Sequence, residues 1–282
     1  MSLIFVILSS ICYGLTPIAQ TFALNAGLSP EIIILFTALT GLILSAVLCL
    51  INKTSFKVNT KELIILLICS VCGVYLTDLL LELSYTLIPA GFATTIHFIY
   101  PTLICIVNVI VFKAKPDIRI IMSLILSLCG LLLLGSYVKD ISINGFVYAF
   151  LSAVVYGLYL ILCEHSSIHE INSFTQTFYI SIYALIISVF TSLNTGFTGF
   201  NGNQIFLLVL CGLLQSGGLI FMALGIKKTG SSIASLLSTL EPIVSLSASF
   251  LILKSGLTLT SIIGCILILL SLLPIIRKED QL

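Results

Sequence analysis

The sequence predicts an all-α integral membrane protein with ten transmembrane helices, arranged as two inverted five-helix repeats around a central cavity. Three observations support this fold class. Hydrophobic residues make up 59% of the chain and charged residues only 8%, whereas roughly a quarter of a soluble domain is charged. The apolar residues form runs that are long enough to cross a bilayer, which takes about 20 residues as a helix. Finally, the plan of the run at 88–115 recurs at 229–256.

The ten expected helices follow one another with short connectors. None of the connectors is long enough to form a soluble domain, and strict alternation of the kind found in membrane barrels is absent. The net charge of +1 implies no nucleic-acid partner. The expected segments are 2–24, 30–51, 62–84, 89–112, 117–136, 142–163, 172–192, 203–225, 230–253 and 257–276.

The repeat rests on matched residues in the two halves. Setting Pro101 against Pro242 places Tyr100 opposite Glu241, and the run Tyr-Gly-Leu at 13–15 recurs at 156–158. Each unit has an odd number of helices, so the second copy must enter the membrane with inverted orientation. We therefore predict a first repeat over 1–137, a second repeat over 138–276 and a short cytoplasmic tail at 277–282.

The basic residues predict the orientation of the chain, because cytoplasmic loops carry an excess of Lys and Arg. With both termini in the cytoplasm of a multi-pass cell-membrane protein, only Lys139 and Lys254 face outside. The loop after segment six is the one conflict, since it carries Glu164, His165, His169 and Glu170 without a Lys or Arg. The residues expected on the cytoplasmic side are Lys53, Lys57, Lys61, Lys113, Lys115, Arg119, Lys227, Lys228, Arg277 and Lys278.

Several short runs carry a resemblance to a known family. They are Tyr13-Gly-Leu-Thr-Pro17, Gly27-Leu-Ser-Pro30 and Leu240-Glu241-Pro242. Together with the ten segments, they resemble the EamA-type members of the drug/metabolite transporter superfamily. The resemblance implies a 5+5 inverted-repeat fold with a central cavity, and export or exchange of small metabolites, often amino acids. One departure is that many relatives carry Gly-Glu after helices four and nine, where this chain has Ala114-Lys115 and Ser255-Gly256.

Four ionisable residues lie beyond the first turn of an expected helix, and each is a candidate functional group because a charge there costs roughly 2.5–3.5 kcal/mol on insertion scales. At about 1.5 Å per residue, Glu241 lies near the midplane. Pro242 cannot donate to the Ser238 carbonyl, so a carboxylate and a free carbonyl could together bind an ammonium group or a proton. The alternative is that Glu241 joins helix nine to a neighbour by a hydrogen bond.

Asp78, Glu82 and His97 are the other three. Asp78 and Glu82 lie four residues apart on one helix face, where they could form a proton-coupling or cation-attracting site. Alternatively, Glu82 is solvated at the outer surface and Asp78 bonds a neighbouring helix. His97 titrates near neutrality when unperturbed and shares a face with Tyr100, so the pair could line the cavity. A histidine in a membrane helix can also serve only as an interhelical hydrogen-bond partner.

Further polar residues at depth complete the candidate substrate site. Tyr13, Tyr75 and Gln215 fall near mid-depth, away from the interfacial belt where tyrosines gather, and Tyr156 lies closer to the cytoplasm, where it could line an inner gate. Packing against another helix is the alternative for each. The predicted hinges are the prolines that interrupt helices one, four and nine, namely Pro17, Pro101 and Pro242.

The sequence shows no catalytic or phosphate-binding motif, so we expect no enzyme, cofactor or metal. Cys69 and Cys72 form a C-x-x-C within an apolar run and are expected to pack. The predicted function is export or exchange of a small polar metabolite by alternating access, in a monomer or homodimer, with protons as a candidate coupling ion. The alternatives are an exporter of cationic drugs and a membrane binding or sensor subunit that transports nothing.

Overall fold

Helices make up the structured part of the chain. The computed structural model describes residues 3–85, 87–88, 90–115, 117–134, 142–192, 199–253 and 258–279, and no strand occurs within them. Lys139 and Lys254, which were expected outside, lie beyond the described residues, as does the expected repeat boundary at 137/138. The first half consists of α1 (Leu3–Asn25), α2 (Pro30–Ile51), α3 (Thr60–Ser70), the π-helix η1 (Val71–Leu76), α4 (Thr77–Tyr85), α5 (Ala90–His97), α6 (Tyr100–Ile110) and α7 (Ile118–Leu134).

The second half repeats this plan with longer helices. Within α10, Gly230 has φ +79° and interrupts the helix, so the expected separation of helices eight and nine is present there. At the chain end, α12 runs to Glu279, so the tail expected at 277–282 begins within a helix. The elements are α8 (Ile143–His165), the 3-10 helix η2 (Ser167–Glu170), α9 (Ser173–Ser192), α10 (Gly202–Leu237), α11 (Leu240–Leu253) and α12 (Leu259–Glu279).

Ten apolar segments result, as the sequence predicts. In the described residues, seven helices are long and apolar enough to cross a membrane, and three shorter apolar helices lie at Ile118–Leu134, Leu240–Ile252 and Leu259–Pro274. Local signals start several of them. Ser29 caps α2 ahead of Pro30, and a capping box between Asn59 and Glu62 starts α3.

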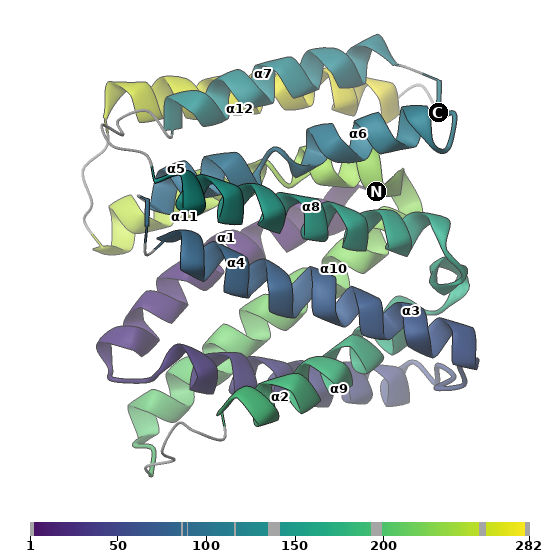
Figure 1. The fold of residues 1–282 in the computed structure, drawn as a ribbon, viewed down its shortest axis with the longest axis vertical. Helices are drawn as coiled ribbons and strands as arrows, with labels where there is room; N and C mark the ends of the chain where they lie inside the picture. The colour runs from purple at the N-terminus through teal and green to yellow at the C-terminus, as the bar shows by residue number, and fades with distance from the viewer. Residues whose placement is uncertain are drawn as a thin grey trace.

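The helices pair across the two halves. α1 packs along α10, α2 against α9, and α7 against α12, while α8 contacts η1, α4, α5 and α6. Figure 1 shows α7 and α12 together at one edge of the bundle, and α2 and α9 at the other. This pairing is symmetric between the halves. The contact of α1 with α10 has its counterpart in the contact of α8 with η1 and α4, and the pairs α2–α9 and α7–α12 each join equivalent helices of the two halves. This is the pairing expected of a ten-helix repeat fold.

Glycines allow the closest of these contacts. A Cβ added to Gly218 of α10 would lie 2.6 Å from the ring of Tyr13 on α1, and a Cβ added to Gly73 of η1 would overlap the ring of Tyr159 on α8. Each half therefore sets a tyrosine ring against a glycine of the other half. Gly14 faces the carbonyl of Glu241 in the same way.

The helical segments that contain Pro101 and Pro242 are each broken just before the proline. α5 ends at His97 and α6 begins at Tyr100, directly ahead of Pro101. On the other side, α10 ends at Leu237 and α11 begins at Leu240, two residues ahead of Pro242. Pro17 differs, because α1 continues through it unbroken.

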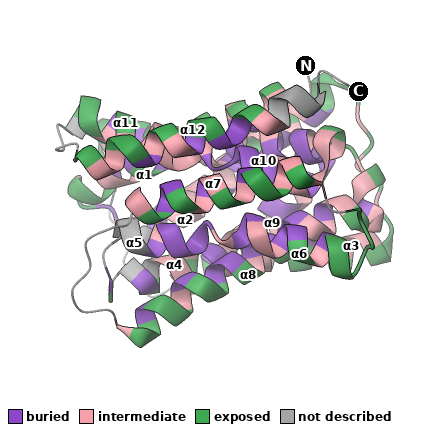
Figure 2. Ribbon diagram, turned by 90° about the horizontal axis from the view of Figure 1, so that it is seen from above, coloured by how far each residue is buried: buried purple, intermediate pink, exposed green. Residues whose placement is uncertain are grey.

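The outer surface is apolar. Leu50, Ile110, Phe190, Leu251 and Leu259 are each more than two-thirds exposed, and Figure 2 shows the buried residues on the inward faces of the helices. A soluble protein rarely leaves so much apolar surface exposed. All described Lys and Arg residues belong to the end of the bundle where α1 begins and α12 ends, which is the end expected in the cytoplasm.

The contact between α7 and α12 yields a test of this packing. A Cβ on Gly130 would lie 2.7 Å from the carbonyl oxygen of Gly264, and a backbone atom cannot turn away. We expect Gly130→Ala to lower the free energy of unfolding by about 1–3 kcal/mol through overpacking, measured by thermal unfolding in detergent. Gly217→Ala is the matched control, because its Cβ meets only Cys12 Sγ at 3.4 Å. Equal stability of the two variants would contradict the close contact.

Candidate functional site

An open cavity of about 670 Å³ occupies the centre of the bundle. It extends from mid-depth, at Gly14 and Gly73, to the end of the bundle where α1 finishes, at Leu24 and Ser261. Its walls come from both halves, with α1, η1, α4, α5 and α7 on one side and α8, α10, α11 and α12 on the other. A volume of this size falls within the range of small-molecule sites, about 300–1,000 Å³.

Most of the predicted site residues line this cavity. The six that do so are Tyr13, Asp78, His97, Tyr156, Gln215 and Glu241, and two of the predicted hinges, Pro17 and Pro242, join them. Tyr100 is 1% exposed and lies behind the wall. Tyr75 is half-buried on η1 and lines neither this cavity nor the smaller pocket beside it. The structure therefore gathers predicted residues from six helices, α1, α4, α5, α8, α10 and α11, around one space.

Glu241 is the deep carboxylate of the cavity. It lies in the first turn of α11, and its Oε1 atom is buried without a hydrogen-bond partner. Tyr13, Tyr100 and Tyr156 are all near enough to interact with it electrostatically. A charge held in a low-dielectric environment without a partner is costly, so Glu241 needs either a proton or a cationic group beside it.

One expectation about Glu241 was wrong. The Ser238 carbonyl was expected to be free, because Pro242 cannot donate to it. In the structure, the N–H of Glu241 donates to this carbonyl at 2.9 Å. The helix break tightens the turn by one residue, and this satisfies the carbonyl. The carboxylate side chain, rather than the backbone, is therefore the polar group that this segment offers to a ligand.

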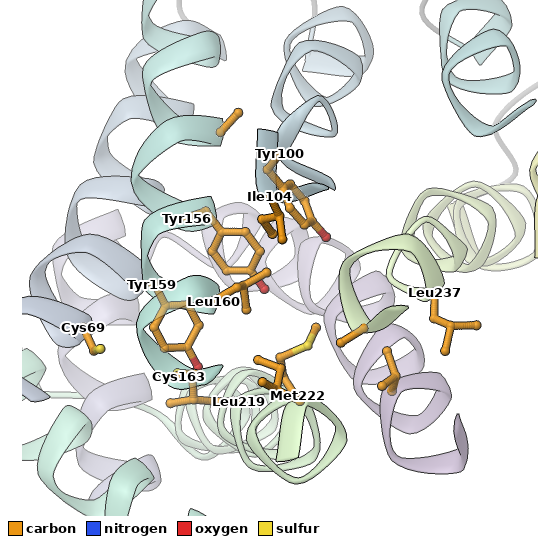
Figure 3. Close-up of a cluster of buried hydrophobic side chains, with 14 of the residues drawn as sticks. Cys69, Tyr100, Ile104, Tyr156, Tyr159, Leu160, Cys163, Leu219, Met222 and Leu237 are labelled. Carbon is orange, nitrogen blue, oxygen red and sulfur yellow. The ribbon is translucent and has the colours of Figure 1, made fainter. Parts of the chain in front are cut away.

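Aromatic rings surround the same region. The ring of Tyr100 lies 4.8 Å from that of Tyr156, edge to face, and 5.3 Å from that of His97. Tyr100 reaches this position from α6 and Tyr156 from α8 (Figure 3). The hydroxyl of Tyr100 is buried without a partner. Tyr100 itself lies behind the wall, but Tyr13 and Tyr156 line the cavity. Because tyrosine ring faces attract cations, these two rings and the carboxylate favour the same class of ligand.

His97 is held in one tautomer by Ser152 of α8. Its Nδ1 lies 2.9 Å from Ser152 Oγ, and the Ser152 hydroxyl donates its only proton to the Ala149 carbonyl at 2.6 Å. Nδ1 must therefore be the donor, and in the neutral ring Nε2 is the acceptor. His97 thus forms the interhelical bond that was its alternative role, and it also lines the cavity.

Asp78 belongs to a second polar region. A small pocket of about 40 Å³ adjoins the main cavity and shares Tyr13, Gln20, Asp78 and Gln215 with it. This volume suits one or two water molecules. The side chain of Glu82 lies outside the described part of the chain, so its expected pairing with Asp78 stays a prediction.

The charge of the site is one-sided. Among the described residues that line the main cavity are two carboxylates, Asp78 and Glu241, and one imidazole, His97, but no Lys or Arg. No group of three potential metal ligands occurs in the described residues. An arrangement of this kind suits a ligand with a positive charge more than an anion.

Sequence reasoning missed several cavity residues. Gln20, Thr77 and Ser245 contribute polar side chains to the wall, although none was singled out. A signal for Gln20 was present, because residues 13, 17, 20 and 24 follow helical spacing along one face of α1. Extending the face of Tyr13 along the helix would have found it.

Comparisons with known proteins agree with this geometry. A family model described as the EamA-like transporter family matches residues 1–136 and 143–277. A solved structure, described only as the crystal structure of a protein, has a TM-score of 0.83 and 13% identity, covering 99% of this chain and 98% of that chain. At that identity it supports the fold alone. No curated protein sequence matches.

The direction in which the cavity opens can be tested by labelling. Thr21 lines the cavity near its mouth, so we expect a Thr21→Cys side chain to react with a membrane-impermeant maleimide added outside intact cells. Cys211 is fully buried and serves as an internal control that stays unlabelled. Labelling of Thr21→Cys only in inverted vesicles would contradict the predicted orientation.

Proposed function

Because the chain belongs to the EamA-like transporter family, we propose that it moves a small polar metabolite with a cationic amino group, such as an amino acid, across the cell membrane. It works as an exporter or exchanger by alternating access, with both termini in the cytoplasm. The proposal includes no enzymatic step. The multi-pass helical architecture and the family match support transport as such, and the chemistry of the cavity supports the choice of substrate.

The unpartnered carboxylate of Glu241 is the observation that supports a cationic substrate. Its buried Oε1 accepts no hydrogen bond, the cavity that it lines contains a second carboxylate, and no described Lys or Arg lines that cavity. An ammonium group placed beside Glu241 would gain a charge-assisted hydrogen bond and contacts with the tyrosine rings. Gln215, on another wall of the same cavity, would donate its amide N–H groups to the remaining oxygen atoms of the substrate, and Asp78 would accept hydrogen bonds from its donor groups.

The size of the cavity favours a second candidate. At about 670 Å³, it has room for ligands of drug size as well as for single amino acids. A larger organic cation could fill the space between Glu241 and the apolar residues Leu24, Leu81 and Leu246. A ligand-protection screen that includes both classes separates the two candidates.

A proton is the simplest coupling ion for this site. A buried carboxylate must be neutralised by a proton or by a cation, and Glu241 can hold only one of them at a time. Competition between the two would tie the movement of substrate to that of protons. The breaks ahead of Pro101 and Pro242 provide places where α6 and α11 can turn as the two proposed repeats rock around the site.

Glu241→Gln is the most direct variant, since it removes the charge and nearly keeps the volume. We expect it to lower uptake of a cationic substrate into proteoliposomes by at least tenfold, because the charge-assisted bond is lost, and to abolish the pH dependence of that uptake. Glu31→Gln is the matched control, because Glu31 lies in the first turn of α2 and outside both cavities.

Two results would count against the proposal. The substrate assignment fails if Glu241→Gln transports the cation at the rate of the unmodified protein. The transport assignment fails if the unmodified protein binds ligands but moves none of a panel of amino acids, amines, nucleosides and sugars. That second outcome would favour a binding or sensor subunit.

A further inference from the structure

A polar cluster closes the end of the bundle opposite the cavity mouth. It consists of Asn108 on α6, Glu164 and His165 in the last turn of α8, and Ser231 and Ser232 just after the break in α10. Asn108 is 6% exposed and Ser231 is fully buried. Glu164 and His165 were expected in a loop, but both turn inward and bond to other helices. We call these five residues the inner cluster.

Asn108 joins the two halves of the molecule. Its Nδ2 donates to Ser232 Oγ at 2.8 Å and to Ser231 Oγ at 3.1 Å. Its Oδ1 lies 2.9 Å from His165 Nε2, so Nε2 carries the proton and donates. The amide thus uses both donors and its acceptor on α8 and α10, which belong to the proposed second repeat, while α6 belongs to the first.

Glu164 fixes the segment that follows Gly230. Its Oε2 accepts a hydrogen bond from the Ser231 N–H at 2.8 Å and another from the Ser231 hydroxyl. The same oxygen lies 3.4 Å from His165 Nε2. Gly230 makes this arrangement possible, because its φ of +79° is disfavoured for other residues and a Cβ there would lie 2.8 Å from Glu164 Oε1.

Further packing closes the same end. The ring of Phe112, just beyond α6, stacks on His165 at 3.6 Å with an interplanar angle of 12°. Figure 3 shows Ile104, Leu160, Met222 and Leu237 among the buried side chains of the core, and each is at most 1% exposed. Along their helices, Ile104 and Leu160 come one turn before Asn108 and Glu164. None of the described residues that line the cavity belongs to these four or to the inner cluster, so the described cavity ends short of them.

The corresponding positions at the open end carry no such cluster. Setting Pro101 against Pro242 places Asn108 opposite Ser249, and setting Tyr13 against Tyr156 places Glu164 opposite Thr21. Ser249 and Thr21 both line the cavity near its mouth. The Thr21 hydroxyl donates within its own helix, to the Pro17 carbonyl at 2.8 Å. Single bonds still join the halves at this end, from Ser84 to the Gly145 carbonyl and from Gln204 to the Ala26 carbonyl. No described contact of Ser249, however, matches the three bonds that Asn108 makes between the halves.

We infer that the inner cluster is the inner gate of the transport cycle, with Asn108 as the residue that connects the two repeats. This inference rests on the proposed transport function and identifies gating residues that the function alone does not assign. The gate is closed in this structure, whose cavity opens at the other end. Opening toward the termini requires α6 to leave α8 and α10, which breaks the three bonds of Asn108 and unstacks Phe112 from His165.

The native Cys105 reports on the gate. It lies one helical turn before Asn108, between the cluster and the cavity, and is 8% exposed. We expect Asn108→Ala to raise the rate at which an impermeant thiol reagent, applied from the side of the termini, labels Cys105 by at least tenfold. Mass spectrometry of the labelled peptides separates Cys105 from the other cysteines. Ser127→Ala is the matched control, because that hydroxyl bonds only within its own helix, to Leu124.

Phe112→Ala provides a second variant, because it removes a ring that is 42% exposed and should raise labelling by a smaller factor. Unchanged labelling in folded Phe112→Ala, and in Asn108→Ala where it folds, overturns the inference. Substrate flux, measured in the same proteoliposomes, distinguishes a failure of the proposed transport function from a failure of the proposed gate. Absence of flux in the unmodified protein defeats the transport function, whereas flux with unchanged labelling in the variants defeats the gate alone.

Discussion

Hydrocarbon offers no hydrogen bonds, and this constraint determines where the polar side chains of the bundle lie. Each buried polar group must find a partner inside the protein. Serine hydroxyls do so across helix contacts, for example from Ser9 to the Gly218 carbonyl, from Ser70 to Ile180 and from Ser84 to Gly145. Seven described side-chain atoms depart from this pattern, and Glu241 Oε1 is the one carboxylate oxygen among them. An unsatisfied buried group requires an explanation, and a ligand in the adjoining cavity provides one.

The two ends of the bundle combine a similar backbone with different side chains. In each half a tyrosine ring packs against a glycine of the other half, Gly218 or Gly73. The breaks between α5 and α6 and between α10 and α11 both fall just ahead of a proline. At one end, small hydroxyl side chains leave a cavity, whereas at the other Asn108 and Glu164 form a closed network. A symmetric frame allows both openings, and the unequal side chains favour one of them. The state seen here is the one in which the inner cluster is complete.

The sequence was sufficient for most of the fold, because long apolar runs and matched prolines depend on local composition and spacing. Six of the eight expected site residues line the cavity for the same reason, since an ionisable or tyrosine side chain at mid-depth must face the interior. Tyr75 shows the limit. It lies in the π-helix η1, where the wider turn rotates the side chains that follow, and no pattern predicted this turn. Glu164 was missed because a residue at a helix end looks like part of a loop until its partner, Ser231, is known.

The central claim is that the cavity recognises a positive charge. The most direct test uses an amino acid and its N-acetylated form, which lacks the ammonium charge, each offered to proteoliposomes that contain the unmodified protein. We expect the amino acid to accumulate and the acetylated form not to, because acetylation removes the ammonium group that Glu241 would bind. Equal transport of both compounds would contradict it.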